Sequence, residues 1–162
     1  MVNLKLVDTS IKYLLVLLLI LMFSITFIQV IMRYVFLNAI PWAEEAVRFM
    51  FVWASFLGAA IGIKEKIHIG IDLVTAKLPK LGQRITSTVV YCVIIWFAYF
   101  MITVGWEFMM FTHGQLSPAL VIPMSYVHAA IPVSGVLFVI YSSIELVKLW
   151  RKPKEESVAS GQ

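Results

Sequence analysis

Four long apolar stretches constrain the fold of this 162-residue sequence more than any other feature. They cover residues 11–37, 43–63, 85–112 and 123–149, and each is long enough for a membrane-spanning helix, which needs about 20 mostly apolar residues. Because 61% of the residues are hydrophobic, the chain has more apolar side chains than a soluble core of this size can bury. The sequence therefore predicts an all-α membrane protein with four transmembrane helices.

These stretches follow one another with short connections, so residues 1–152 are predicted to form a single transmembrane domain. Residues 153–162 are polar and are predicted to be a disordered cytoplasmic tail. A kink is predicted in the fourth span, where Pro132 lies beside Ser134 and Gly135.

Two amphipathic segments predict short helices that lie along the membrane surface. The first spaces its apolar residues as a helix does and is expected to lie on the inner surface before the chain turns into the membrane; these residues are Leu4, Val7, Ile11 and Leu14. The second covers residues 71–81 and is expected to be interrupted near Pro79.

The distribution of basic residues predicts the orientation of the chain. All but two of the 13 Lys and Arg residues lie in the two tails or in the connection between the second and third spans. By the positive-inside rule these segments are cytoplasmic, whereas residues 38–42 and 113–122 face outward. The membrane topology thus explains the net charge of +4, and nucleic acid is not expected as a partner.

The second span begins with three charged residues, Glu44, Glu45 and Arg48. Its apolar side chains favour insertion by about 4 kcal/mol, and an arginine at mid-membrane would nearly cancel this at a cost of about 2.5–3.5 kcal/mol. Arg48 is tolerated because it lies near the outer end, can extend to water and has both glutamates one turn before it. Two interpretations stay open. The charges only stabilise the helix start, or they bind a partner together with Arg33.

The same span carries Ala54, Gly58 and Gly62 at four-residue steps. Small residues at this spacing let another helix approach closely. That helix could belong to this chain or to another subunit, and the sequence does not distinguish the two.

Three histidines raise the question of a metal or haem site. His68 is expected on the cytoplasmic side, whereas His113 and His128 are expected near the outer face, so the three cannot converge; polar residues at the interfaces are the favoured interpretation. The centres of the four spans contain no acidic or basic residue, although ion-coupled carriers normally need one there. We therefore predict no enzyme activity, no cofactor or metal, and no substrate-binding residue in this chain.

The segment from Gln29 to Asp72 resembles the signature of the small membrane subunit of tripartite ATP-independent periplasmic (TRAP) transporters. The matching positions are Arg33, Tyr34, Trp42, Glu44, Glu45, Arg48, Phe56, Leu57, Gly58, Ala59, His68 and Asp72. The later SPALVIPMSYVHAAIP segment is similar to the family's outer loop at the entry to the fourth span.

The resemblance implies a bacterial inner-membrane protein that braces a large membrane subunit, which moves substrate by a sodium-driven elevator motion. A periplasmic substrate-binding protein would deliver an organic acid, such as sialic acid or a C4-dicarboxylate, and the small subunit would help it dock. Membrane lipids are the remaining partners. The residues expected at partner interfaces are Arg33, Trp42, Glu44, Glu45, Arg48, Ala54, Gly58 and Gly62.

Two other classes of protein were weighed. An autonomous four-helix transporter acting as an oligomer would be expected to carry a carboxylate at mid-span, and the sequence has none there. A cytochrome-like electron carrier would be recognised by the absorption spectrum of the purified protein.

Overall fold

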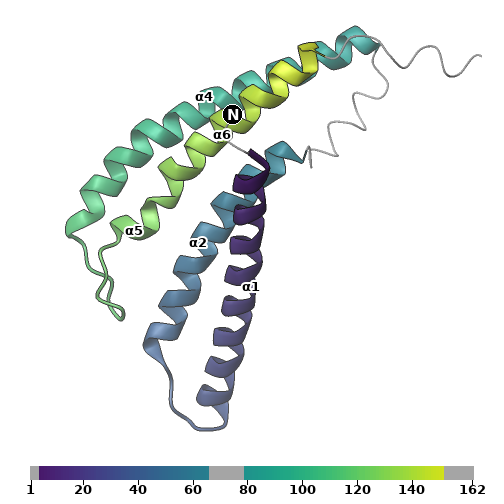
Figure 1. Ribbon diagram of the computed structural model, residues 1–162. Coiled ribbons are helices and arrows are strands. Elements are labelled where there is room, and N and C mark those ends of the chain that lie inside the picture. Colours follow the sequence, from purple (N-terminus) through teal and green to yellow (C-terminus); the bar gives the residue numbers. More distant parts are fainter. Residues whose placement is uncertain (1–3, 66–78, 152–162) are drawn as a thin grey trace, which may run out of the picture.

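A computed structural model describes residues 4–65 and 79–151 of the chain (Figure 1). Its helices are α1 (Leu4–Tyr34), α2 (Pro41–Lys64), α4 (Lys80–Phe111), the 3-10 turn η1 (Thr112–Gly114), α5 (Ser125–His128) and α6 (Ala130–Arg151). Four segments are long and apolar enough to cross a membrane: Leu6–Tyr34, Pro41–Lys64, Leu81–Gly114 and Ser125–Trp150. The predicted four-helix transmembrane architecture is confirmed.

The predicted surface helix before the first span is wrong. Instead, α1 runs without a break from Leu4 to Tyr34, because this segment contains no Gly or Pro that would interrupt its hydrogen bonds. The helix ends three residues earlier than predicted. Leu37 has a φ of 51°, a left-handed conformation that cannot continue a right-handed helix.

Two prolines mark the starts of the next helices. Pro41 occupies the first turn of α2, where its missing N–H needs no acceptor. Pro79 directly precedes α4, which begins at Lys80 and therefore includes Leu81, contrary to the prediction that this residue belongs to a surface helix. The rest of that predicted helix and the tail at 153–162 lie outside the described residues.

The fourth span is interrupted at Ala129, which separates α5 from α6. Pro132 explains this, because it has no N–H to donate to the carbonyl of His128 and its ring crowds that carbonyl. Backbone bonding resumes with the N–H of Val133, which donates to the carbonyl of Ala129 at 3.2 Å. This break in helical bonding lies about one turn before Pro132, and the kink predicted in the helix axis stays a prediction.

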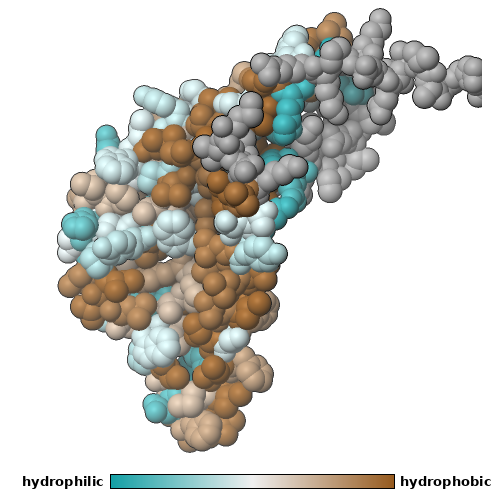
Figure 2. Space-filling view, viewed as in Figure 1, coloured by the Kyte–Doolittle hydropathy of each residue, from teal (hydrophilic) through white to brown (hydrophobic). Residues whose placement is uncertain are grey.

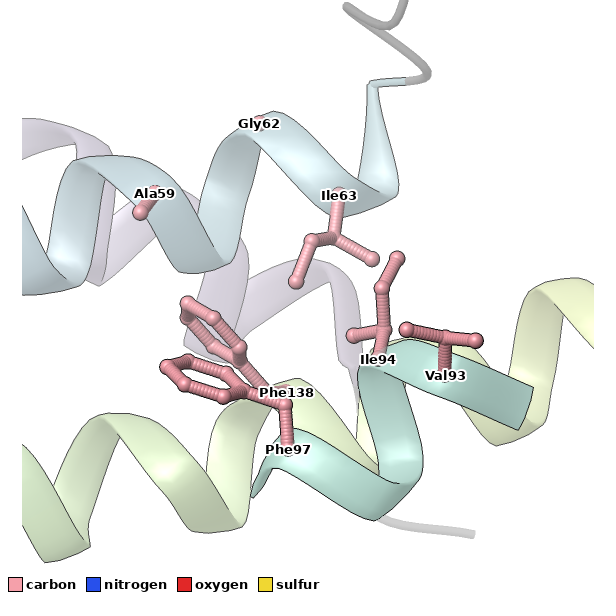
Figure 3. Close-up of a pocket in the computed structure, with 7 residues that line it drawn as sticks. All are labelled: Ala59, Gly62, Ile63, Val93, Ile94, Phe97 and Phe138. Carbon is pink, nitrogen blue, oxygen red and sulfur yellow. The ribbon is translucent and has the colours of Figure 1, made fainter. Parts of the chain in front are cut away.

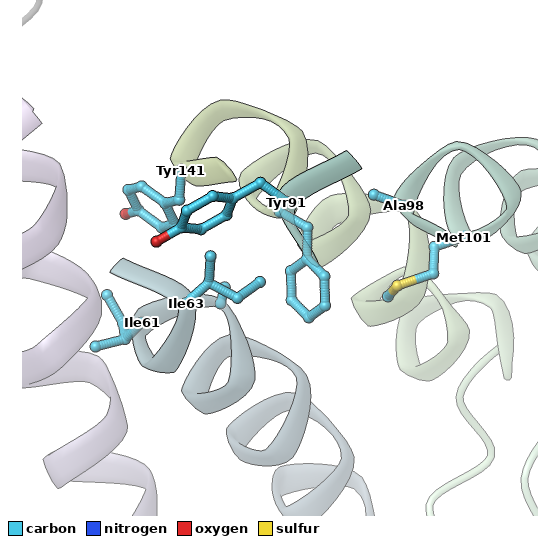
Figure 4. Close-up of a cluster of buried hydrophobic side chains, with 8 residues drawn as sticks. Ile61, Ile63, Tyr91, Ala98, Met101 and Tyr141 are labelled. Carbon is cyan, nitrogen blue, oxygen red and sulfur yellow. The ribbon is translucent and has the colours of Figure 1, made fainter. Parts of the chain in front are cut away.

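The helices pack as two pairs, α1 with α2 and α4 with α6, and the pairs meet where α2 packs against α6 (Figure 1). A core of buried side chains joins α2, α4 and α6 at this contact (Figure 4). Its members are Ala60, Ile61, Ile63, Tyr91, Ala98, Met101, Phe138 and Tyr141.

Two glycines allow α4 and α6 to approach each other closely. A Cβ on Gly105 would lie 2.8 Å from Cγ2 of Ile131, and one on Gly135 would lie 3.0 Å from Cβ of Met101 and 3.2 Å from the carbonyl oxygen of Ala98. Such distances leave no room for a side chain. These small residues are thus used within the chain itself.

Apolar side chains are also widespread on the surface (Figure 2). The longest exposed run lies on α1, where Phe23 and Phe27 are 77% and 68% exposed. Such a surface is stable in lipid but not in water. It indicates that α1 faces membrane or another membrane protein.

Candidate interaction site

Glu45, in the first turns of α2, binds a distant loop. The backbone N–H groups of Ala119 and Leu120 donate to its Oε2 at 2.9 Å and 2.8 Å. Bonds from two neutral donors to one carboxylate are charge-assisted and stronger than ordinary backbone bonds. Of the two glutamates that precede Arg48, Glu45 therefore has its carboxylate bonded to the loop that connects η1 to α5.

Glu44 is the glutamate that pairs with Arg48. Its Oε1 accepts a hydrogen bond from Nη2 of Arg48 at 3.4 Å, one helical turn away. The two side chains are 66% and 70% exposed, so solvent screens the pair and its contribution to stability is small. Both groups are accessible to a partner.

The other two predicted interface residues at this end of the molecule, Arg33 and Trp42, are both exposed. Arg33 is exposed at the end of α1, and among the described residues no hydrogen bond or ion pair joins it to Glu44 or Glu45. Trp42 is 49% exposed at the start of α2. The single charged cluster predicted from the sequence is therefore divided into separate groups.

The segment that Glu45 binds, residues 115–124, is called the α4–α5 loop below. It folds back on itself: Leu116 pairs with Pro123, and the N–H of Ser117 donates to the carbonyl of Ile122 at 2.9 Å. The N–H of Met124 donates to the carbonyl of Gln115 at 2.8 Å and closes the base. The loop is therefore a compact hairpin rather than an irregular connection.

Helix α5, which follows this loop, is bonded to α2 and η1 through side chains that the sequence analysis did not assign to an interface. Nε1 of Trp53 donates to the carbonyl of Tyr126 at 3.1 Å. Hydrogen bonds also join His113 to Ser125 at 3.1 Å and His128 to Thr112 at 2.9 Å. The two histidines thus bind different hydroxyl groups, and no potential metal cluster lies among the described residues. His68 and Asp72 lie outside that part of the chain.

At the other end of α2, a buried carboxylate joins three helices. Asp8 on α1 is 4% exposed, forms an ion pair with Lys64 on α2, and accepts a hydrogen bond from the hydroxyl of Tyr141 on α6 at 2.7 Å. We call these three residues the Asp8 cluster. Beside it, Lys12 pairs with Glu65 and lowers the pKa of that carboxyl below its usual 4.5, through a hydrogen bond and its charge.

Sequence reasoning missed the Asp8 cluster because its members lie far apart in the chain. The only signal in the sequence is an acidic residue just before the first apolar stretch, in the N-terminal amphipathic segment. Glu145 on α6 is a second buried carboxylate: it is 4% exposed and accepts a hydrogen bond from Lys148 at 2.5 Å.

The α2 glycine face (Ala54, Gly58 and Gly62) is open. A Cβ added to either glycine would have no heavy atom of the described residues within 4 Å. Beside Gly62 lies an apolar groove of about 470 Å³ between α2 and α4, with one aromatic ring from α6 (Figure 3). Its lining is Ala59, Gly62, Ile63, Val93, Ile94, Phe97 and Phe138. Close packing against the described residues, 4–65 and 79–151, therefore does not explain these two glycines.

The geometry defines a helical multi-pass membrane protein with a structured loop at one end and a vacant face on its second span. A family model of the DctQ component of tripartite ATP-independent periplasmic transporters matches residues 22–152. The chain belongs to this family of small TRAP permease subunits. It is accordingly a multi-pass protein of the bacterial inner membrane and part of a transporter, and its family is not an enzyme family.

Three relatives illustrate the match. A TRAP transporter small permease protein of Haemophilus influenzae is 29% identical over 154 residues, which are 94% of this chain and 92% of the relative. The C4-dicarboxylate TRAP transporter small permease protein DctQ of Vibrio cholerae is 33% identical over 52% of this chain and 36% of its own length. The isethionate TRAP transporter permease protein DctMQ of Oleidesulfovibrio alaskensis is 35% identical over 69% of this chain and 19% of its own.

The Asp8 cluster gives a prediction about stability. Replacing Asp8 by Ala removes the acceptor of the Tyr141 hydroxyl and the counter-charge of Lys64, whose side chain is 31% exposed, and should cost about 1–3 kcal/mol. Tyr141→Phe removes one hydrogen bond and should cost about 1 kcal/mol. Thermal unfolding of the purified chain in detergent measures both, with exposed Glu107→Ala as the control that should match the unmodified chain. An Asp8→Ala midpoint equal to that of the control would contradict the role assigned to the cluster.

Proposed function

We propose that this chain is the static small subunit of a sodium-coupled TRAP transporter and braces a large, elevator-type membrane subunit. The observation that carries the proposal is the vacant α2 glycine face. Gly105 and Gly135 lie at the close contact between α4 and α6. In contrast, a Cβ added to Gly58 or Gly62 would have no heavy atom of the described residues within 4 Å. Small residues within a membrane span are useful where another helix packs against them.

One relative contains the segment similar to this chain within a much longer permease, which supports a lasting association with a larger membrane protein. In DctMQ of Oleidesulfovibrio alaskensis the segment similar to this chain is 19% of one permease polypeptide. A segment joined covalently to the rest of a permease stays beside it at high effective concentration. We propose that the same association forms here between two separate chains. A helix of the large subunit would then cover the α2 glycine face.

The substrate class proposed is a small organic acid. The named relatives are transporters for C4-dicarboxylate and isethionate, both of which carry acidic groups. A sialic acid TRAP transporter permease protein of Haemophilus influenzae is a further relative, 31% identical over 42% of this chain. Because the spans have no charged residue at mid-membrane, this subunit is not proposed to bind the substrate itself.

We also propose that both termini are cytoplasmic and that the α4–α5 loop faces the periplasm, where a substrate-binding protein docks. The basic residues of the tails and of the connection between α2 and α4 support this orientation. The exposed Glu44–Arg48 pair, Arg33 and Trp42 are then the groups at the periplasmic end that remain available to a soluble partner.

Reconstitution tests the function directly. Alone in liposomes, the chain should move no organic acid under an inward sodium gradient. Together with a large TRAP membrane subunit, and with the binding protein outside, it should support uptake. Uptake by the isolated chain would instead favour the autonomous four-helix transporter.

The proposed interface predicts a contrast between glycines. Gly58→Leu and Gly62→Leu add side chains where the chain itself has open space, so each variant should keep its own thermal stability but lose co-purification with the large subunit. Gly135→Leu should destabilise the chain itself, because the space beside it is filled. Normal co-purification of both α2 variants would place the interface elsewhere.

Orientation is tested by cysteine labelling in a Cys92→Ser background. Cysteines at Asn38 and Gln115 should react with an impermeant thiol reagent added to the periplasmic side, whereas one at Lys77 should react only after the membrane is opened. Labelling of the Lys77 position in sealed cells would reverse the proposed topology.

A further inference from the structure

The α4–α5 loop is more highly structured than a link between two spans requires. Besides the bonds at its base, the N–H of Ile122 donates to Oγ of Ser117 at 3.3 Å, and the N–H of Val121 donates to the carbonyl of Ser117 at 3.2 Å. Ser117 is 2% exposed, so its polar atoms are used inside the loop. A short connection between helices can be made without such a network.

The backbone of the loop is also strained. Val121 has a φ of 56°, in the left-handed region that a β-branched side chain rarely adopts. The two N–H bonds to Glu45 come from Ala119 and Leu120, the residues directly before it. Unfavourable conformations of this kind persist where surrounding contacts enforce them and are typical of functional segments.

The side chains that this backbone presents are apolar. Leu116, Val121 and Ile122 are 59%, 63% and 36% exposed, and no charged residue occurs between positions 114 and 124. Glu45 tethers this apolar tip to the first turns of α2, where the Glu44–Arg48 pair is exposed. An apolar centre beside exposed polar groups is typical of protein–protein interfaces.

We propose that the α4–α5 loop is the docking element for the periplasmic substrate-binding protein, and that Glu45 is the residue that positions it. The inference depends on the proposed function and on the orientation given above. Its new content is the surface: the loop tip makes the contact, and Glu45 acts through the loop rather than by touching the partner.

A soluble protein fits this loop better than lipid does. Lipid accepts apolar side chains in any arrangement, so insertion into a bilayer would need neither the strained Val121 nor the two bonds to Glu45. A protein partner gains affinity from a surface that is held in its bound shape beforehand.

A soluble partner also fits better than the large membrane subunit. Glu45 and Gly58 are separated by 13 positions of one helix, which corresponds to about 20 Å along its axis. The membrane-embedded partner therefore has its own surface on the α2 glycine face, well away from the loop.

The first experiment changes one exposed side chain of the loop. Val121→Asn replaces an apolar contact by a polar one, and Asn tolerates the left-handed backbone, so the loop should keep its shape. In the reconstituted complex, this variant should bind the purified, substrate-loaded binding protein about tenfold more weakly. Leu37→Asn is the matched control, because Leu37 is also apolar, 87% exposed and left-handed with a φ of 51°, but lies in the α1–α2 connection. It should bind normally.

The second experiment tests the positioning role of Glu45. Glu45→Ala removes the acceptor of both loop N–H groups and should weaken binding about as much as Val121→Asn. Glu45→Gln keeps an acceptor oxygen and should restore most of the affinity, which a direct ionic contact between Glu45 and the partner would not allow. Glu107→Ala, a change at another exposed glutamate toward the same end, should have no effect.

The outcomes separate this inference from the function on which it depends. Normal binding by both Val121→Asn and Glu45→Ala, in a complex that still transports, overturns the docking role and leaves the proposed function intact. Equal losses from Leu37→Asn and Val121→Asn also overturn it, because they indicate a general effect of the apolar surface. Loss of co-purification in Val121→Asn would assign the loop to the large subunit. If the unmodified chain supports no uptake with its partners, the proposed function itself fails.

Discussion

A buried carboxylate in a membrane protein is stable only when nearby groups compensate for its lost hydration. Asp8 obtains this compensation from two other helices, through the ammonium of Lys64 and the hydroxyl of Tyr141. The cluster thereby bonds α1, which packs along α2, to α6 in the other helix pair. The surrounding side chains are mostly apolar, and their contacts have no directional preference. The bonds of the Asp8 cluster therefore fix the position of one helix pair relative to the other.

This arrangement leaves much of the molecule without internal partners. None of the residues in the most apolar window of α1 is buried by the described remainder of the chain, and the α2 glycine face borders an open apolar groove. Large apolar surfaces are harmless in lipid, so their presence alone says little. The small side chains are more informative, because lipid gains nothing from a glycine, whereas a neighbouring helix gains close packing.

The sequence predicted the features that depend on local composition and missed those that depend on distant residues. Four apolar runs were sufficient to locate the spans, and Pro132 was sufficient to locate the break at Ala129. The partner of Glu45 was not predictable in this way. Arg48 lies one turn away and is visible in the sequence, whereas Ala119 and Leu120 bind through backbone groups more than 70 residues later.

Glycines show the same limit. Gly58 and Gly135 look alike in sequence, since each lies in an apolar helix. Gly58 faces open space, whereas a Cβ added to Gly135 would lie only 3.0 Å from Cβ of Met101 on α4. Spacing shows that a close approach is possible. Only the fold shows whether another helix of the same chain already packs against the glycine.

The bonds at the two ends of α2 have a mechanical consequence. The Asp8 cluster connects α2 to α6 at one end of α2, Trp53 connects it to α5 near its middle, and Glu45 connects it to the α4–α5 loop at its other end. Two rods joined at one point can rotate about it, but two rods joined at both ends cannot rotate without breaking a joint. A sideways displacement of α2 would therefore have to break its bonds to α6 at one end or to α5 and the α4–α5 loop toward the other, so the two helix pairs are expected to move together.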